Sequence, residues 1–213
     1  MEPDGFTQAA NALVKGLSAG DAERIRALAA PEFWERAGES DYAERLPVNG
    51  TVELLGTLGD RSLLLVTPSP GADGRRYALE QAWSADSPPR VVDERLFTLV
   101  DATRVRAEGD AERLAQLATK LAAQDAAEAL AVALADNDIE AVRAMVEPEH
   151  VEIAGREAER AARATRAELV GSVGPRTLVR VWSGDADATL EYLWRPHGDR
   201  LQIAFVREFS RAG

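Results

Sequence analysis

The sequence has 213 residues, of which 46% are hydrophobic and 29% are charged, a composition typical of a globular protein with its own core. Its formal net charge of −11 disfavours contact with nucleic-acid phosphates, and the absence of cysteine excludes disulfides, thiolate metal sites and cysteine nucleophiles. The sequence has neither a secretory signal nor an apolar run long enough to span a membrane, so we expect a cytoplasmic protein with no membrane or nucleic-acid partner.

The first half of the chain predicts helices followed by strands. Ala10, Leu13 and Leu17 recur at helical spacing, which predicts an amphipathic helix over residues 7–18. Asp21 is a suitable cap for a second, short helix that stops before Pro31, and a third, irregular helix is expected over residues 37–45. The hydrophobic period then changes to two, which predicts strands over residues 52–58, 62–67, 75–84 and 91–100.

The second half predicts the same order of elements after an alanine-rich helical linker at residues 102–121. Asp138 and Pro148 take the places of the first cap and the first helix-stopping proline. A regular third helix is expected over residues 156–168. Short strands are predicted over residues 167–173, 177–182, 188–194 and 200–210, joined by turns that favour an antiparallel meander.

The two halves also match residue by residue. Residues 10–32 align without a gap on residues 127–149, and residues 53–61 align on residues 168–176. The offset between the halves shrinks only across loop-like stretches, as expected of duplicated domains with trimmed loops. The sequence therefore predicts a tandem duplication, with an α+β repeat at 5–101, the helical linker at 102–121 and a second α+β repeat at 122–213.

Each repeat resembles the ketosteroid isomerase/nuclear transport factor 2-like superfamily, which includes the SnoaL-like cyclases. The resemblance lies in the order of elements and in the helix openings Gly20-Asp21 to Pro31 and Asn137-Asp138 to Pro148. It implies helices packed on one face of an antiparallel sheet, with any pocket between them. Both repeats are somewhat short for this superfamily, and a simpler cystatin-like helix-plus-sheet unit remains an alternative.

Two central strands are apolar on both faces, at residues 63–66 and 178–182. A strand of this kind must be covered on both sides, and the helices of its own repeat can cover only one. We therefore expect the two sheets to pack face to face as an intramolecular pseudo-dimer, and a homodimer of whole chains remains open. Outer sheet faces that are open to water would contradict this expectation.

Glu80 and Glu191 recur at equivalent positions and resemble a pair of catalytic carboxylates. Strand alternation places them opposite the aromatic side chains of the same strands, such as Trp83 and Trp194, which should face the helices. A structural role is favoured for both glutamates, with Arg61 and Arg176 as their partners.

The best candidate pocket lies in the first repeat. Strand alternation turns one acid inward, and Asp93 or Glu94 beside Trp83 could act as a general acid or base. The alternative is a pair of solvated acids on an edge strand. The residues expected to contact a ligand are Trp34, Tyr42, Tyr77, Gln81, Trp83 and, at the equivalent of Phe33 in the second repeat, His150.

No sequence motif indicates a cofactor or a metal. Asp136-Asn137-Asp138 imitates the start of a calcium loop, but the glycine that such a loop needs is absent and the repeat predicts a helix junction here. Two functions remain. We favour a non-catalytic module that binds an apolar small molecule or a basic protein partner, and the alternative is a SnoaL-like enzyme that uses acid–base chemistry.

Overall fold

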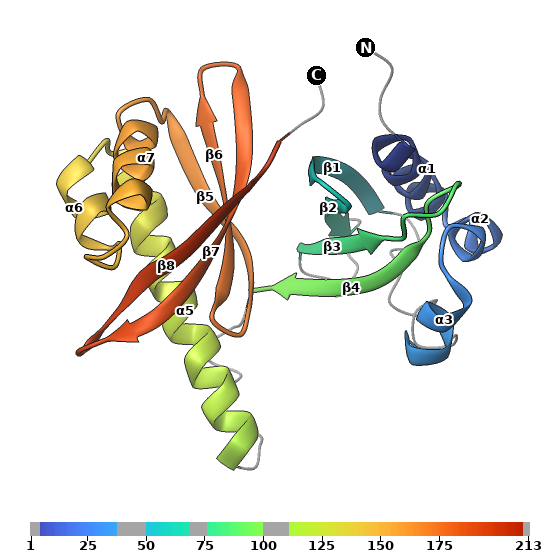
Figure 1. Ribbon diagram of the computed structural model, residues 1–213, viewed down its shortest axis with the longest axis horizontal. Coiled ribbons are helices and arrows are strands. Elements are labelled where there is room, and N and C mark those ends of the chain that lie inside the picture. Colours follow the sequence, from blue (N-terminus) through green and yellow to red (C-terminus); the bar gives the residue numbers. More distant parts are fainter. Residues whose placement is uncertain (1–4, 38–49, 69–75, 100–110, 211–213) are drawn as a thin grey trace. The chain divides into compact units, whose positions relative to one another are not determined.

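The computed structural model describes residues 5–37, 50–68, 76–99 and 111–210 (Figure 1). Within these residues the chain is α+β, with six helices and eight antiparallel strands that neighbour one another in chain order from β1 to β8. The chain divides into two compact units, residues 1–96 with 209–213 and residues 97–208. We call them unit 1 and unit 2. The predicted α+β class and the antiparallel strand order are confirmed, but the strands belong to one eight-stranded sheet and not to two separate four-stranded sheets.

Unit 1 follows the predicted order of elements, but its third helix begins at Pro31 and not at residue 37, and residues 38–45 of the expected helix lie outside the described residues. Asp21 caps α2 as expected, because its carboxylate accepts the backbone N–H of Arg24 at 3.0 Å. The second helix ends before Pro31 as predicted, and Pro31 is the first residue of the third helix, a position at which proline is well tolerated. The elements are α1 (Gly5–Ala19), α2 (Ala22–Ala27), α3 (Pro31–Ala37), β1 (Gly50–Leu58), β2 (Arg61–Pro68), β3 (Tyr77–Trp83) and β4 (Val91–Thr98), the last of which ends in unit 2.

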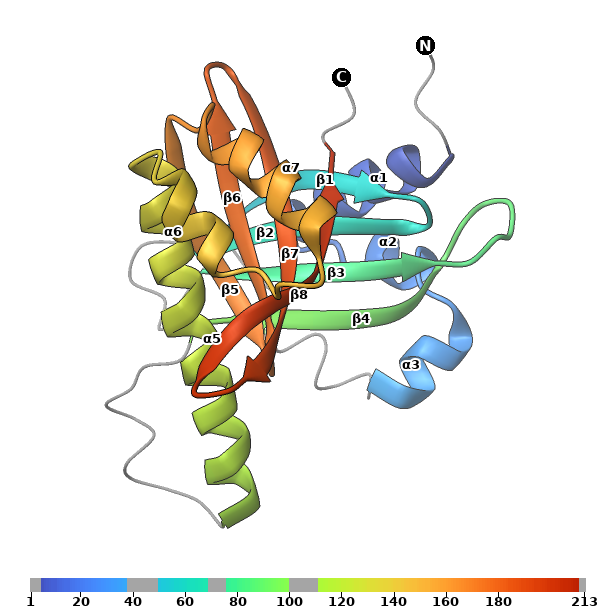
Figure 2. The same cartoon turned by 60° about the vertical axis from the view of Figure 1, so that its left-hand side comes forward.

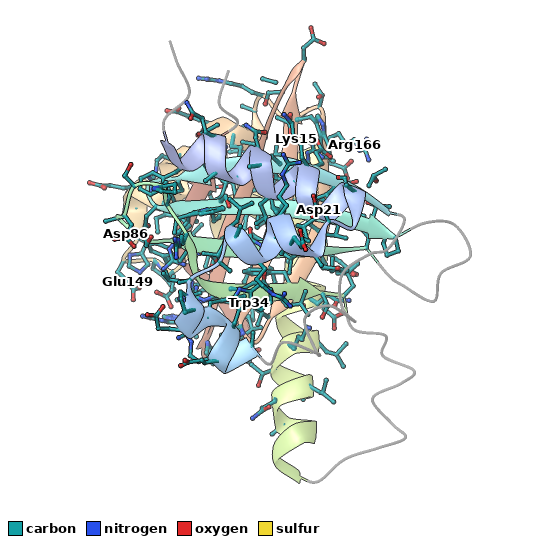
Figure 3. The ribbon with its side chains drawn as sticks, turned by 90° about the vertical axis from the view of Figure 1, so that its right-hand side faces the viewer. Lys15, Asp21, Trp34, Asp86, Glu149 and Arg166 are labelled. Atoms are coloured by element: carbon teal, nitrogen blue, oxygen red, sulfur yellow. The ribbon has the colours of Figure 1, made fainter. Side chains whose placement is uncertain are left out.

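The core of unit 1 lies between its helices and one face of its strands. Figure 3 shows α1 and α2 in front of the strands. Leu13 and Leu17 of α1 pack in one buried cluster with Leu64 and Trp83, so the aromatic face of β3 meets the helices as predicted. Leu63, on the other face of β2, is 0% exposed. Face-to-face packing of two sheets stays a prediction.

Unit 2 repeats the order but departs from the sequence prediction in two places. The expected linker is not a separate element where it is described, because α5 runs unbroken through residues 111–121 to residue 135. The third helix covers residues 151–161 instead of 156–168. The elements are α5 (Ala111–Ala135), α6 (Ile139–Ala144), α7 (Val151–Ala161), β5 (Arg166–Val173), β6 (Arg176–Ser183), β7 (Ala186–His197) and β8 (Arg200–Phe209).

The early end of α7 has a physical cause. The backbone N–H of Thr165 donates to the carbonyl of Trp182 at 2.8 Å, which draws residues 165–168 into the sheet beside β6. The run of alanine, arginine and glutamate favours a helix here, but strand pairing outweighs this weak local preference.

The core of unit 2 has the same layers as the core of unit 1. Helix α5 runs alongside β5 (Figures 1 and 2). Leu130 and Leu134 of α5 pack with Tyr192 and Trp194 of β7, and all four side chains are at most 1% exposed. None of the helices in the described residues combines the length and apolarity needed to cross a membrane.

The calcium-like segment is a helix junction, as the sequence comparison predicted. Asn137 adopts a positive φ of 58° after α5, and its amide donates to the carbonyls of Ala161 and Ala164 at 2.7 and 2.8 Å. Asp138 then caps α6 by accepting the N–H of Ala141 at 3.0 Å. The side chains of Asn137 and Asp138 therefore bond to the ends of helices.

In each unit a glycine lies at a bulge where the end of another strand passes close to the backbone. The bulges are in β1 and β5, and the strand ends belong to β8 and β4. In unit 1, a β-carbon on Gly56 would lie 2.8 Å from the carbonyl of Phe209, and Thr57 pairs with Ser210 next to it. In unit 2, a β-carbon on Gly171 would lie 2.9 Å from the carbonyl of Phe97. Only glycine permits so close an approach of two backbones.

Candidate functional site

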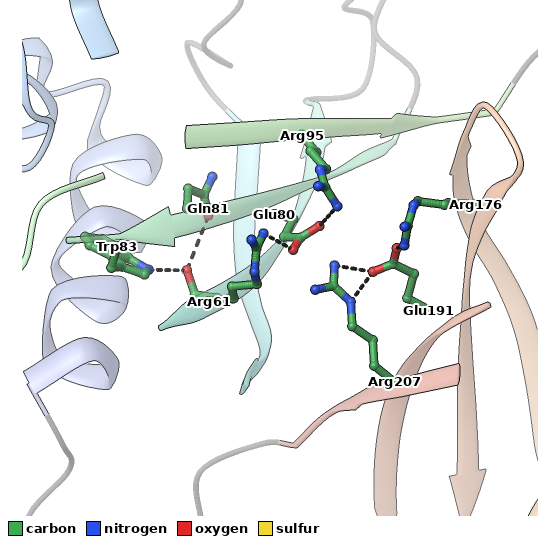
Figure 4. Close-up of polar contacts among 9 residues, drawn as sticks. Arg61, Glu80, Gln81, Trp83, Arg95, Arg176, Glu191 and Arg207 are labelled. Carbon is green, nitrogen blue, oxygen red and sulfur yellow. Dashed lines mark hydrogen bonds and ion pairs between the residues drawn. The ribbon is translucent and has the colours of Figure 1, made fainter. Parts of the chain in front are cut away.

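Glu80 lies in a buried ion pair in unit 1. Its side chain is 1% exposed, and Arg61 Nη1 donates to its Oε1 at 2.7 Å (Figure 4). Arg95 Nη1 approaches the other carboxylate oxygen at 3.7 Å. The predicted partner Arg61 is therefore confirmed, and Arg95 is a second one that alternation did not reveal.

Glu191 is held in the same way in unit 2. Its side chain is 0% exposed and lies between Arg176 and Arg207, which bond to different oxygens of the carboxylate (Figure 4). Arg176 is the predicted partner, and Arg207 occupies the position that Arg95 has in the first unit. A buried carboxylate enclosed by two guanidiniums is a structural element, since both of its oxygens are engaged.

The two predicted catalytic acids lie on β4 in different surroundings. Asp93 is exposed, so it does not lie in an enclosed site beside Trp83. Glu94 is partly buried and its Oε2 accepts from Gln81 Nε2 at 3.2 Å. Burial and the charge of Glu94 raise the pKa of Tyr77 to about 12. Glu94, Gln81 and Tyr77 thus form one polar group, while Asp93 points away from it.

The aromatic residues predicted to line a pocket are divided between core and surface. Trp83 is 2% exposed and its indole N–H donates to Ser62 Oγ at 2.9 Å, so it is a core residue. Phe33 is also buried, and its ring meets the partly exposed Trp34 edge to face at 5.6 Å. Tyr42 lies outside the described residues.

A pocket of about 590 Å³ opens beside Trp34 in unit 1. Its polar groups come from three elements, with Arg26 on α2, Trp34 and Glu35 on α3, and Arg90 before β4. The indole N–H of Trp34 donates to the carbonyl of Arg26 at 3.4 Å, which restrains the ring beside the pocket. The remaining lining residues are Ala27, Ala29 and Pro31.

His150 has a partner that the sequence did not indicate. Its Nε2 lies 3.0 Å from Glu147 Oε2, one helical turn before α7, and its side chain is 35% exposed. With Glu149, these residues place three potential metal-ligand atoms within 4.8 Å of one another. The site stands before the N-terminus of α7, where the helix dipole disfavours a cation. His150 is remote in sequence from the pocket of unit 1 and does not line it.

A buried polar network in unit 2 was missed at the sequence level. The Tyr192 hydroxyl donates to Glu157 Oε2 at 2.6 Å, and Arg160 joins Glu157 to Glu208. Glu157 is 1% exposed, whereas Arg156 and Glu159 on the same helix are exposed. Burial, followed by the charge of Glu157, raises the pKa of Tyr192 well above that of an ordinary tyrosine.

Unit 2 also holds a pocket of about 450 Å³ beside Lys120. It is lined by Gln116, Leu117, Thr119 and Lys120 of α5 and by Gly174 and Pro175, which follow β5. Lys120 Nζ donates to Thr98 Oγ1 at 2.7 Å, and burial lowers the pKa of its ammonium group. No prediction from the sequence concerned this lysine, because it lies in the segment read as a linker.

Comparisons with protein-family models, with curated proteins and with solved structures found no match to this chain.

Proposed function

We propose that this protein is a non-catalytic module that binds a small organic acid, built on a duplicated nuclear transport factor 2-like scaffold. The observation that carries the proposal is the pocket of unit 1, whose lining includes two arginines and a tryptophan, from α2, from α3 and from the residue before β4. The ligand would have a carboxylate at one end and a flat or apolar body at the other.

The charges of the pocket support an anionic ligand. Arg26 and Arg90 contribute two positive charges against the single carboxylate of Glu35, in a chain whose formal net charge is −11. A guanidinium group matches a carboxylate in shape and can donate two parallel hydrogen bonds to it. A local positive site on an acidic chain would select an anion by charge.

The apolar part of the lining supports a ligand with a hydrocarbon body. Ala27, Ala29 and Pro31 offer no polar side chain, and the ring of Trp34 offers a flat surface for stacking. Binding sites for small molecules commonly combine such a lining with a few well-placed polar groups. The ligand that this lining favours is therefore an amphipathic acid, more specific than the apolar molecule expected from the sequence. A basic protein partner stays a prediction.

Catalysis has less support than binding. Neither of the two pockets described above is lined by Asp93 or Glu94. Asp93 is exposed, and Glu94 accepts a hydrogen bond from Gln81. The acid–base alternative would require a substrate to reach Glu94 on the inner face of the sheet.

Matched contacts support the proposed duplication. Trp83 donates to Ser62 Oγ at 2.9 Å, and Trp194 donates to Thr177 Oγ1 at 2.8 Å. The two Arg–Glu–Arg groups and the two aspartate caps also recur at equivalent positions. Side-chain contacts of this specificity rarely arise twice by chance, and they join strands that the repeat aligns.

The proposal is tested by titrating the protein with 4-phenylbutyrate, with the neutral 4-phenylbutan-1-ol as the matched analogue. We expect saturable binding of the acid by calorimetry and much weaker binding of the alcohol. Arg90→Ala should weaken binding of the acid at least about tenfold, equivalent to roughly 1.4 kcal/mol. Trp34→Leu should weaken both compounds, because each loses the stacking surface.

The control is Arg143→Ala. Arg143 is the equivalent of Arg26 in the second repeat, but it pairs on the surface with Glu140 at 3.0 Å and lines neither pocket. This variant should bind the acid as the wild type does. Equal weakening by Arg90→Ala and Arg143→Ala would show a nonspecific charge effect, and no saturable binding would refute the proposed ligand class.

A further inference from the structure

Lys120 differs from the other lysine of the chain in its surroundings. The sequence contains only Lys15 and Lys120. Lys15 is exposed on α1 (Figure 3), whereas Lys120 is partly buried and borders the pocket of about 450 Å³ in unit 2. In the described part of the chain, the recorded partner of the Lys120 ammonium group is the hydroxyl of Thr98, and no carboxylate lies within ion-pair distance.

A partly buried amine without a counter-charge loses its proton more readily than an exposed one. Burial penalises the ammonium ion, and the neighbouring Gln116, Thr119 and Thr98 bring no negative charge to offset that penalty. Arg176, which follows the Gly174–Pro175 turn, is itself positive and is paired with Glu191. A neutral lysine amine carries the lone pair that makes it a nucleophile.

We propose that Lys120 is the reactive amine of a second small-molecule site, which captures an aldehyde or ketone as a reversible imine. The Lys120 nitrogen attacks the carbonyl carbon, and one of its protons passes through solvent to the carbonyl oxygen to give a carbinolamine. Loss of that oxygen as water then leaves the C=N bond. The step needs no oxidant, reductant or metal, and hydrolysis reverses it.

The lining of the pocket fits this chemistry. Leu117 and Pro175 provide apolar walls for the body of the carbonyl compound. Thr98 Oγ1 lies 2.7 Å from the nitrogen and holds the amine at the pocket wall. Lys120 is the one charged residue among the lining residues, whereas sites for simple anions usually provide several hydrogen-bond donors or positive charges.

The wild-type protein itself supplies the internal standard for a test. The protein is incubated with benzaldehyde and sodium cyanoborohydride near pH 7.5, and mass spectrometry of peptides assigns the reduced adduct to Lys15 or Lys120. An ordinary lysine is only about 0.1% neutral at this pH, so a lowered pKa multiplies the reactive fraction. We expect Lys120 to be labelled at least about fivefold more than Lys15, with saturation as the aldehyde concentration rises.

Two further measurements separate a site from general reactivity. In urea the difference between the two lysines should disappear, because unfolding removes the burial of Lys120. Gln116→Trp, at an exposed helix position on the rim of the pocket, should reduce labelling of Lys120 severalfold and leave Lys15 unchanged. Lys120→Arg should abolish the label in this pocket.

The result that overturns the proposal is equal or greater labelling of Lys15 in the folded protein. Labelling of Lys120 that rises linearly with aldehyde and never saturates would also overturn it, since this shows reaction without a binding site. A third contrary outcome is the absence of any trapped imine on Lys120, which would show that the pocket does not capture the aldehyde. None of these results bears on Arg26 or Arg90, so the binding function proposed for unit 1 is tested separately.

Discussion

Gly171 and Phe97 approach each other so closely in unit 2 that a β-carbon on the glycine would lie 2.9 Å from the carbonyl carbon and oxygen of Phe97. Gly56 and Phe209 have the same relationship in unit 1, at 2.8 Å. Both phenylalanines are 0% exposed, and they lie at the ends of their strands, Phe209 as the last residue of β8 and Phe97 as the last but one of β4. The glycines are therefore required by a backbone crossing that anchors a strand end.

We predict that Gly171→Ala and Gly56→Ala each lower the free energy of unfolding by about 1–3 kcal/mol, because the backbone must move to admit the methyl group. Urea denaturation followed by circular dichroism measures this loss. Gly155→Ala is the control, since nothing lies within 4 Å of a β-carbon there and the residue is inside α7. That variant should be stabilised by about 0.5–1 kcal/mol. If all three variants behaved alike, the close approach would not be the cause.

The elements of this fold were largely predictable because they depend on local patterns. Strand alternation placed Trp83 and Trp194 towards the helices, and Asp21 and Asp138 identified two helix starts from their capping chemistry. These signals lie within a few residues of the feature that they predict, so one sequence was sufficient.

The parts that the sequence did not predict depend on partners far along the chain. Glu157 meets Tyr192 across 35 positions. Helical spacing places Glu157 on the core-facing side of α7 with Ala154 and Ala161, but nothing local to the helix identifies its tyrosine partner. The end of α7 is decided by pairing with β6, and the surroundings of Lys120 are decided by the Gly174–Pro175 turn. For the same reason, alternation alone could not tell that Asp93 is exposed while Glu94 bonds to Gln81.

The Tyr192–Glu157 hydrogen bond should contribute to stability. Tyr192→Phe removes the donor and leaves a buried carboxylate with Arg160 as its remaining recorded partner, so we expect a loss of about 1–3 kcal/mol in the free energy of unfolding. The measurement is chemical denaturation near pH 7. Glu159→Gln serves as the control on the same helix, because its pair with Arg163 is about three-quarters exposed on both sides. An equal effect of the two variants would contradict a special role for the buried bond.

The two buried glutamates should differ in how much they stabilise their units. Glu191 is bonded to two arginines, whereas Glu80 has one close contact and one arginine at 3.7 Å. We predict that Glu191→Gln costs up to about 3 kcal/mol, because it leaves two partly buried guanidiniums without their counter-charge, and that Glu80→Gln costs less. Unfolding in urea measures both.

Glu140→Gln is the surface control for this pair of variants. Glu140 bonds to Arg143 at 3.0 Å, but its side chain is 84% exposed. Pairs of this kind contribute only about 0–1 kcal/mol, so the variant should be close to the wild type in stability. A loss of ligand binding in Glu80→Gln with unchanged stability would instead assign that residue to a functional site.

Alkaline pH should destabilise the protein through its buried tyrosines. Burial raises the pKa of Tyr192 well above its usual value and that of Tyr77 to about 12, whereas an unfolded tyrosine titrates near 10. Above about pH 10 the unfolded chain loses tyrosine protons that the folded chain keeps, so the free energy of unfolding falls as pH rises, and for Tyr77 this loss continues to about pH 12.

Lys120 should make the free energy of unfolding rise with pH, over a lower pH range than the fall caused by the tyrosines. Its folded pKa is lowered, so the unfolded chain binds the extra proton, and stability rises with pH until an ordinary lysine has titrated, at about 10.5. The expected curve of unfolding free energy against pH therefore rises slightly and then falls. Tyr192→Phe should remove most of the fall and Lys120→Met should remove the rise, each without changing the other limb. A fall of unchanged slope in Tyr192→Phe would mean that its hydroxyl is not the group that titrates.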